Sequence, residues 1–249
     1  TGTIVATNST VNLGGVFLTT GFSLSRTGGV VNVTGQMNNT GNTFNFTPST
    51  GAWNLSGGSI SGGAINFIGS DRLLITPNAG TLFDVQVNGE LLFDTTNAVA
   101  RMAGTTRFTA ARLSASNASI QFAPGYTLND LVVAEGAAAG QRSITGAVGG
   151  NGALTIGATG VIRLAAGAGA NLAIQNSNTV TVINNGLISA EAAGRSLTFN
   201  NTTCTNNGAT QVSAGTLDIS PTNWSNAGSV TASNAVLNLS LIHTDAADE

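Results

Sequence analysis

Acidic and basic side chains gather in the middle of the 249-residue chain, where they could form a face that binds or cleaves a sugar polymer. The residues of this possible ligand face are Asp71, Arg72, Asp84, Asp94 and Arg101. Two carboxylates on one face could serve as the acid and the base of glycoside hydrolysis. The simpler interpretation is that these groups are solvated corner residues that keep a nearly neutral protein soluble. We favour the simpler interpretation and assign no catalytic residue.

Other reactive residue types are scarce. His243 is the sole histidine and lies beside the acidic end of the sequence, where a Ser/His/Asp triad is hard to hold. Cys204 is the sole cysteine, so it forms no internal disulfide, and we expect it in the core. One His and one Cys do not make a zinc site without carboxylates, and the sequence has no Lys for Schiff-base chemistry. We therefore predict a protein that is not an enzyme and that binds no metal and no cofactor.

Composition also narrows the range of partners. Charged residues make up 8% of the chain, its formal net charge is −3, and all eight basic residues are Arg. Nucleic acid binding requires a dense basic patch, so we expect no nucleic acid partner. No apolar segment approaches the roughly 20 residues that span a bilayer, so we expect no membrane insertion. The hydrophobic residues, 41% of the chain, alternate with polar ones, which indicates short strands rather than disorder.

Triplets of the form apolar, polar, apolar recur in the N-terminal part at steps of about 20 to 22 residues. One series comprises residues 22–24, 44–46, 65–67 and 85–87. The other series comprises residues 11–13, 31–33, 53–55, 73–75 and 91–93. We expect the members of each series to stack on one another in a column.

The C-terminal part repeats differently, around a recurring glycine. The glycines are Gly160, Gly186, Gly208 and Gly228, and the residues four positions earlier are Ile156, Val182, Cys204 and Trp224. We expect these four apolar residues to form one column. A further series of triplets comprises residues 172–174, 197–199, 217–219 and 237–239.

These columns predict an all-β fold, a right-handed parallel β-helix (β-solenoid) with coils of about 20–26 residues. A triplet buries only one face, so each coil needs a neighbour above and below it. Asn in the middle of a triplet is expected to face outward or to form ladders between coils. Pairs such as Asn185-Gly186 and Asn207-Gly208 are expected at corners, where both residue types accept a positive φ. The same pairs are typical of β-hairpins, so an antiparallel sandwich or barrel is the structural alternative.

The sequence shows no domain boundary, and we expect residues 1–249 to form a single solenoid domain. The stretch around residues 98–147 is less regular, because Arg101, Arg107 and Arg112 crowd together there. We expect this stretch to bulge from the rod. Strand-like segments within it argue against a second domain.

Two segments carry a resemblance to known proteins, namely Gly-Asn-Gly-Ala-Leu-Thr-Ile at 150–156 and Ala-Gly-Thr-Leu-Asp-Ile at 214–219. They resemble the passenger repeats of bacterial autotransporters and of filamentous-haemagglutinin-like surface proteins. The resemblance covers about residues 150–240 and implies a secreted or cell-surface bacterial protein that serves as an adhesin, a stalk or an extracellular matrix component. No receptor-binding motif of that class can be carried over to this chain.

We therefore expect a structural or adhesive β-solenoid segment at the bacterial cell surface or outside the cell, self-assembling or part of a longer rod. Its expected partners are other solenoid coils, copies of itself, and cell-surface glycans or receptors. The alternative is a polysaccharide-binding or polysaccharide-cleaving β-helix. Ice binding is a third hypothesis, although the outward residue varies too much for a flat Thr face.

Overall fold

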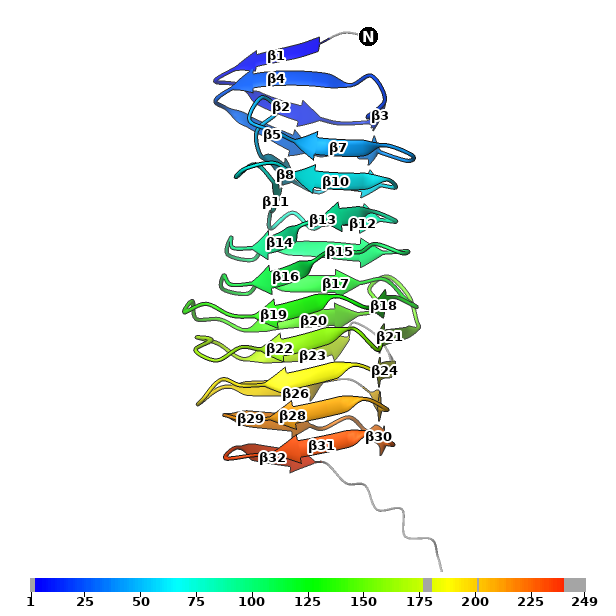
Figure 1. Ribbon diagram of the computed structural model, residues 1–249, viewed down its shortest axis with the longest axis vertical. Helices are drawn as coiled ribbons and strands as arrows, with labels where there is room; N and C mark the ends of the chain where they lie inside the picture. Colours follow the sequence, from blue (N-terminus) through cyan, green and yellow to red (C-terminus); the bar gives the residue numbers. More distant parts are fainter. Residues whose placement is uncertain (1–2, 177–180, 201, 240–249) are drawn as a thin grey trace, which may run out of the picture.

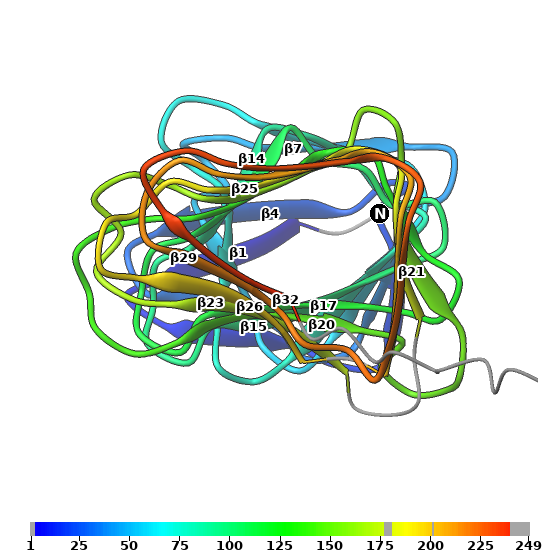
Figure 2. The same cartoon turned by 90° about the horizontal axis from the view of Figure 1, so that it is seen from below.

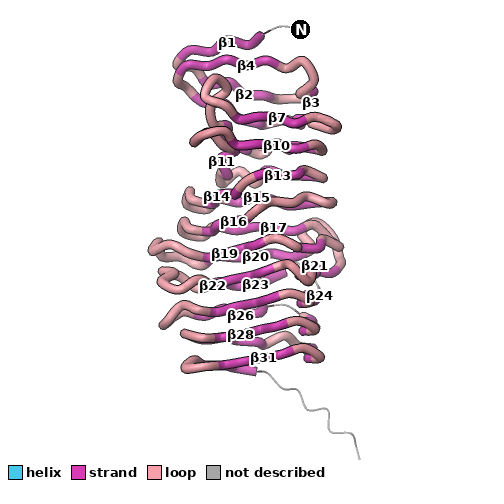
Figure 3. Tube along the Cα trace, viewed as in Figure 1, coloured by secondary structure: helices cyan, strands magenta, loops and turns pink. Residues whose placement is uncertain are grey.

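The computed structural model describes residues 3–176, 181–200 and 202–239. Within these ranges the chain forms 32 β-strands and no helix, and its ladders are parallel (Figures 1 and 3). The described part accordingly has no helix that could cross a membrane. The fold is an all-β parallel solenoid of about 11 turns, as the sequence predicts.

Three sides enclose the core, and the first side is one sheet that runs the whole length of the rod. This 11-stranded sheet contains β3 (Val16–Leu18), β6 (Gln36–Asn38), β9 (Ser59–Ser61), β12 (Gly80–Phe83), β15 (Val99–Ala103), β17 (Ser119–Phe122), β20 (Arg142–Gly146), β23 (Leu172–Asn176), β26 (Ser196–Asn200), β29 (Thr216–Ile219) and β32 (Val236–Leu239).

The second side consists of two sheets that follow one another along the rod. The four-stranded sheet contains β2 (Thr10–Leu13), β5 (Val30–Val33), β8 (Trp53–Leu55) and β11 (Leu73–Ile75). The seven-stranded sheet contains β14 (Glu90–Phe93), β16 (Ala110–Leu113), β19 (Leu131–Ala134), β22 (Val161–Leu164), β25 (Leu187–Ala190), β28 (Ala209–Val212) and β31 (Ser229–Ala232). β14 contacts β11 without forming a ladder with it.

The third side is broken into three sheets. They contain β1 (Thr3–Thr7) and β4 (Ser23–Thr27); β7 (Thr43–Phe46), β10 (Ala64–Phe67) and β13 (Gln86–Asn88); and β18 (Thr127–Leu128), β21 (Ala153–Ile156), β24 (Thr181–Asn184), β27 (Thr203–Asn206) and β30 (Asn223–Asn226). Segment 104–109 occupies this side between β13 and β18 and makes one isolated bridge, from Arg107 to Gln86.

The coil is right-handed, as is usual for parallel crossovers. Figure 2 looks along the rod from the C-terminal end, and the chain passes counter-clockwise toward the viewer from the sheet of β21 to those of β25 and β26. Coil length varies, because the paired residues Thr216 and Val236 are 20 positions apart whereas Ser143 and Ala173 are 30 apart. The longest coil therefore exceeds the predicted 20–26 residues, and the additional residues lie in the corner loops.

Most of the predicted columns are confirmed in register. Val11, Val31, Trp53 and Leu73 follow one another on the second side, and their triplets pair residue by residue. The triplets that begin at 172, 197, 217 and 237 do the same on the first side. Val182, Cys204 and Trp224 also stack as predicted on the third side.

The prediction for Ile156 is wrong. Ile156 pairs with Asn184, and Leu154 is the residue that pairs with Val182. The corner after Ile156 is two residues longer than the corner after Asn184, because a turn from Gly157 to Gly160 intervenes. Equal spacing to the glycine therefore does not mean equal register in the strand.

Two steps of the other N-terminal column are also wrong. Val87, rather than Val85, pairs with Ile65, so Gly89 lies under the ring of Phe67 and leaves room for it. Strand β4 pairs with β1 but has no ladder with β7 in the described residues. Instead, Arg26 of β4 donates to the carbonyl oxygens of the loop after β7, at Thr50 (2.9 Å) and Ala52 (2.8 Å).

The core is continuous from coil to coil. Its N-terminal part is aromatic, with the fully buried Trp53 in contact with Phe22, Phe44 and Phe46 at ring-centroid distances of 4.8–5.9 Å. Cys204 is buried, as predicted, and burial raises the pKa of its thiol to about 12. The stretch around 98–147 keeps its strands in the same first-side and second-side ladders as its neighbours.

Asn ladders join successive coils, as the sequence predicts for the middle residues of the triplets. The amide of Asn32 donates to Asn12, and that of Asn54 donates to Asn32, at 2.8 and 2.9 Å. An equivalent ladder on the third side joins Asn45, Asn66 and Asn88. A third ladder, of Asn184, Asn206 and Asn226, was not predicted and lies largely inside the corner, where Asn184 and Asn206 are buried.

The corner glycines are required for a different reason from the one predicted. Gly186 and Gly208 do not have a positive φ. A Cβ on Gly208 would lie 2.3 Å from the carbonyl oxygen of Gly186, and a Cβ on Gly228 would lie 2.0 Å from that of Gly208. Glycine is therefore needed because neighbouring coils bring their backbones together at this corner.

We expect Gly208→Ala to lower the free energy of unfolding by about 1–3 kcal/mol, because the added methyl group forces two coils apart. Urea unfolding followed by circular dichroism measures the change. Gly14→Ala is the matched control, since Gly14 also lacks a positive φ and its Cβ would meet only the Thr34 hydroxyl, at 3.7 Å. Equal losses in the two variants would contradict the close-approach explanation.

Candidate functional site

The structure spreads the predicted ligand face around the rod. Asp71 and Arg72 lie at the corner between β10 and β11, Asp84 at the corner between β12 and β13, and Asp94 at the corner between β14 and β15, whereas Arg101 lies within β15. No hydrogen bond or ion pair joins any two of these five residues in the described part of the chain. Their shared role in ligand binding stays a prediction.

Three of these residues make local contacts. Asp84 has a φ of 55°, and its carboxylate accepts the backbone N–H and the hydroxyl of Thr105, at 2.7 and 2.9 Å. Arg72 donates to the carbonyl oxygen of Ser70 at 3.2 Å. The guanidinium of Arg101 lies beside Gly149, and its Nε is buried without a hydrogen bond. The contact of Asp84 is structural, because it holds the corner of the next coil.

The remaining predicted chemistry can be placed only in part. His243 lies outside the described residues. The described residues contain no group of three or more His, Cys, Asp or Glu side chains that could hold a metal ion.

Charged groups instead meet across coils of the second side. Arg112 binds Glu90 with two hydrogen bonds of 2.8 Å and binds Glu135 at 3.1 Å. Further along, Arg163 binds Glu191 at 2.8 Å, and Glu191 accepts the hydroxyl of Ser189. These partners are 22, 23 and 28 residues apart, so opposite charges at coil spacing are the signal that could have revealed them.

One arginine is buried without a carboxylate partner in the described residues. Arg142 is only 1% exposed and donates to the carbonyl oxygens of Gly140 and Ser114, at 2.5 and 2.8 Å. Burial lowers the pKa of its guanidinium. Arg142 therefore ties two corner loops together, a role that the sequence pattern did not reveal.

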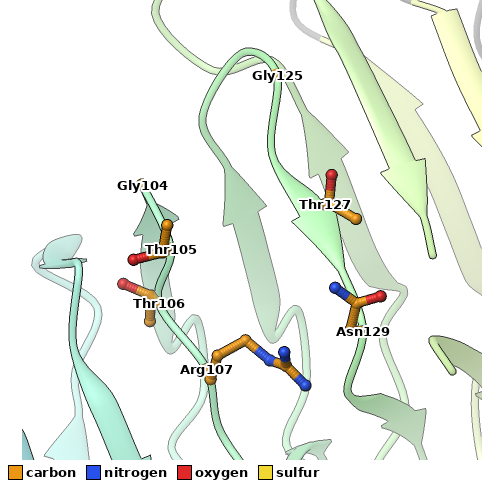
Figure 4. Close-up of a pocket in the computed structure, with 7 residues that line it drawn as sticks. All are labelled: Gly104, Thr105, Thr106, Arg107, Gly125, Thr127 and Asn129. Carbon is orange, nitrogen blue, oxygen red and sulfur yellow. The ribbon is translucent and has the colours of Figure 1, made fainter.

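A cleft of about 420 Å³ opens on the third side, between segments 104–107 and 125–129. Figure 4 shows these two segments side by side, with the side chain of Arg107 reaching toward Asn129. The lining residues are Gly104, Thr105, Thr106, Arg107, Gly125, Thr127 and Asn129. We call this feature the ladder-break cleft, because no ladder joins its two walls in the described residues.

Segment 104–107 forms the upper wall of the ladder-break cleft and segment 125–129 forms the lower wall. On the upper wall, side chains replace the missing main-chain hydrogen bonds. The hydroxyl of Tyr126 donates to the carbonyl oxygen of Thr106, as a strand N–H would. The carboxylate of Asp130 accepts the N–H of Phe108 at 3.4 Å and binds the guanidinium of Arg107 at 2.9 Å. The pair with Asp130 raises the pKa of Arg107, so Arg107 remains charged.

On the lower wall, Thr127 has main-chain groups that the neighbouring strand does not use. Among the described residues, strand β18 is the edge of its sheet and pairs with β21 alone. Toward β21, the carbonyl oxygens of Tyr126 and Leu128 accept the N–H groups of Thr155 and Gly157, at 3.0 and 2.7 Å. Alternate residues of a parallel strand point to opposite edges, so the N–H and C=O of Thr127 point into the cleft.

No protein-family model matches the chain, and neither a curated protein nor a solved structure matches it. The ladder-break cleft is therefore interpreted from its own geometry.

We expect Glu90 to contribute to the pH dependence of stability. The hydrogen-bonded Arg112 holds the pKa of the Glu90 carboxyl below its usual 4.5. A lowered folded-state pKa stabilises the rod at pH values above the unfolded-state pKa, and this contribution is lost as the pH falls through the lowered folded-state pKa. Since the Glu90 side chain is 42% exposed, the effect is expected to be less than about 1 kcal/mol.

Urea unfolding of wild type and Glu90→Gln at several pH values measures this contribution. The decline toward low pH should be shallower in Glu90→Gln. In an Arg112→Met background, the substitution at Glu90 should no longer change the slope. A persistent difference in that background would mean that Arg112 is not the cause.

We expect Tyr126 to resist ionisation in the folded rod. Burial raises the pKa of Tyr126, so a folded state that holds it neutral is stabilised below the ordinary value of about 10 and loses that stabilisation as the pH rises. Tyr126 is the sole tyrosine, so tyrosinate absorbance during a base titration reports this residue alone. Tyrosinate should appear only as the rod unfolds.

The same titration in concentrated urea is the control and should give the ordinary pKa. Tyr126→Phe should lower the free energy of unfolding by about 1–3 kcal/mol, because the Thr106 carbonyl loses its donor. Ordinary titration of Tyr126 in the folded protein would show that the upper wall is open to solvent.

Proposed function

We propose that the chain is a structural or adhesive β-solenoid segment of a secreted or cell-surface bacterial protein. The observation that supports this most directly is the stacking of about 11 turns on one continuous core. At about 4.8 Å per coil, such a stack makes a rod roughly 50 Å long. A rod of this kind suits a spacer or a display surface, and the ion pairs of Arg112 and Arg163 join its successive coils.

Both ends of the described rod have strands with a free edge. At the N-terminal end these are β1, β2 and β3, and at the C-terminal end β30, β31 and β32. Val16 is 74% exposed and Val236 is 52% exposed on these end coils. Free parallel edges are templates for further strands, so we propose that more coils of a longer chain or copies of this chain cover them.

The test is whether the purified chain assembles end to end. Ser229 donates its N–H to Gly208, next to β28, and Ser233 donates to Val212 of β28, so the N–H of Ala232 points to the free edge of β31. Ala232→Pro removes this donor without removing a bond to β28. Negative-stain electron microscopy and sedimentation should show rods longer than one chain for wild type and single rods for Ala232→Pro.

Ala232→Ser is the matched control, because it is also a small substitution but keeps the N–H. It should assemble like wild type. A wild-type chain that stays monomeric at high concentration contradicts self-assembly, and a compact particle in place of a rod contradicts the structural role as well.

A further inference from the structure

The lining of the ladder-break cleft is entirely polar or without a side chain. It combines three Thr, one Asn and one Arg with two Gly, and includes no aromatic or aliphatic residue. Its volume of about 420 Å³ lies within the roughly 300–1,000 Å³ of small-molecule sites. Thr105, Thr106 and Arg107 already bond to Asp84, to core carbonyl oxygens and to Asp130, respectively. The hydroxyl of Thr127 and the amide of Asn129 are therefore the side-chain groups that a ligand with hydroxyl groups can satisfy and an apolar ligand cannot.

Main-chain groups add a fixed donor and acceptor to the cleft. The N–H and C=O of Thr127 point into it from β18, beside the amide side chain of Asn129. Because β18 is held by its ladder to β21, these groups are positioned before any ligand arrives. A neighbouring pair of one donor and one acceptor matches vicinal hydroxyl groups, each of which can donate and accept.

The charges around the cleft do not favour an anion. Arg107 is matched by Asp130, and the carboxylate of Asp84 lies at the same rim, where it binds Thr105. The cleft therefore carries no unmatched positive charge that would attract an acidic sugar.

We infer that the ladder-break cleft binds a short neutral saccharide, of one or two sugar units. An inserted peptide strand fits less well, because Tyr126 and Asp130 already satisfy the upper wall and leave Thr127 alone to pair. A strand would also need pockets for alternate side chains, and the lining offers no apolar pocket. This inference adds a ligand to the proposed rod and does not depend on end-to-end assembly.

The test compares binding of defined probes to the full chain by ligand-observed NMR. The probes are lactose, cellobiose and chitobiose as neutral disaccharides, sialyllactose as an acidic sugar, and a blocked Val-Thr hexapeptide as a strand. At least one neutral disaccharide should bind. Thr127→Val removes the lining hydroxyl beside the main-chain pair and Asn129→Ala removes the amide, and each should weaken this binding about tenfold or more.

Thr155→Val is the matched control. Thr155 pairs with Thr127 in the neighbouring coil, but its N–H is used in the ladder and it does not line the cleft. This variant should bind like wild type, and all three variants should keep the circular dichroism and melting temperature of the parent.

Binding of a neutral disaccharide that is lost in both cleft variants and kept in Thr155→Val supports the inference. The inference fails if no neutral disaccharide binds, if only sialyllactose or the hexapeptide binds, or if binding survives both cleft substitutions. None of these failures changes the assembly measured with Ala232→Pro, so the two proposals are separable.

Discussion

The hydrogen bonds between successive coils run along the axis of the rod, and they hold each residue at a fixed distance from its successor one turn later. The parallel strands lie about 4.8 Å apart. Their register is fixed because a shift by one residue would turn the apolar side chains of a strand out of the core. Asn side chains at equivalent positions, such as Asn12 and Asn32, therefore meet and bond. The corner glycines follow from the same spacing, since there the backbones come closer than a Cβ allows.

Much of the architecture could be predicted because the core residue types recur at nearly constant intervals. The column from Val11 to Leu73 and the triplets after residue 172 were found by spacing alone, and the structure pairs them residue by residue. The errors arose where a corner differs in length. Ile156 stands four residues before its glycine, as Val182 does, but a longer turn shifts its strand by two.

The charged contacts and the cleft are missing from the sequence analysis for two different reasons. Arg112 meets Glu90 and Glu135 only because coil length brings them together, so grouping charges by nearness in sequence does not reveal these pairs. The cleft depends on a ladder that is absent, and absence leaves no repeat to detect. Tyr126 and Asp130 look like ordinary loop residues until the structure shows what they replace.

The interrupted third side also affects how the rod bends. Two ladders, β16 with β19 and β17 with β20, join the coils at this level, while no ladder closes the remaining side in the described residues. Flexural stiffness is therefore unequal around the axis, and the least resistance lies toward the open side. A ligand bound between Thr106 and Thr127 would add contacts on that side and so oppose bending toward it.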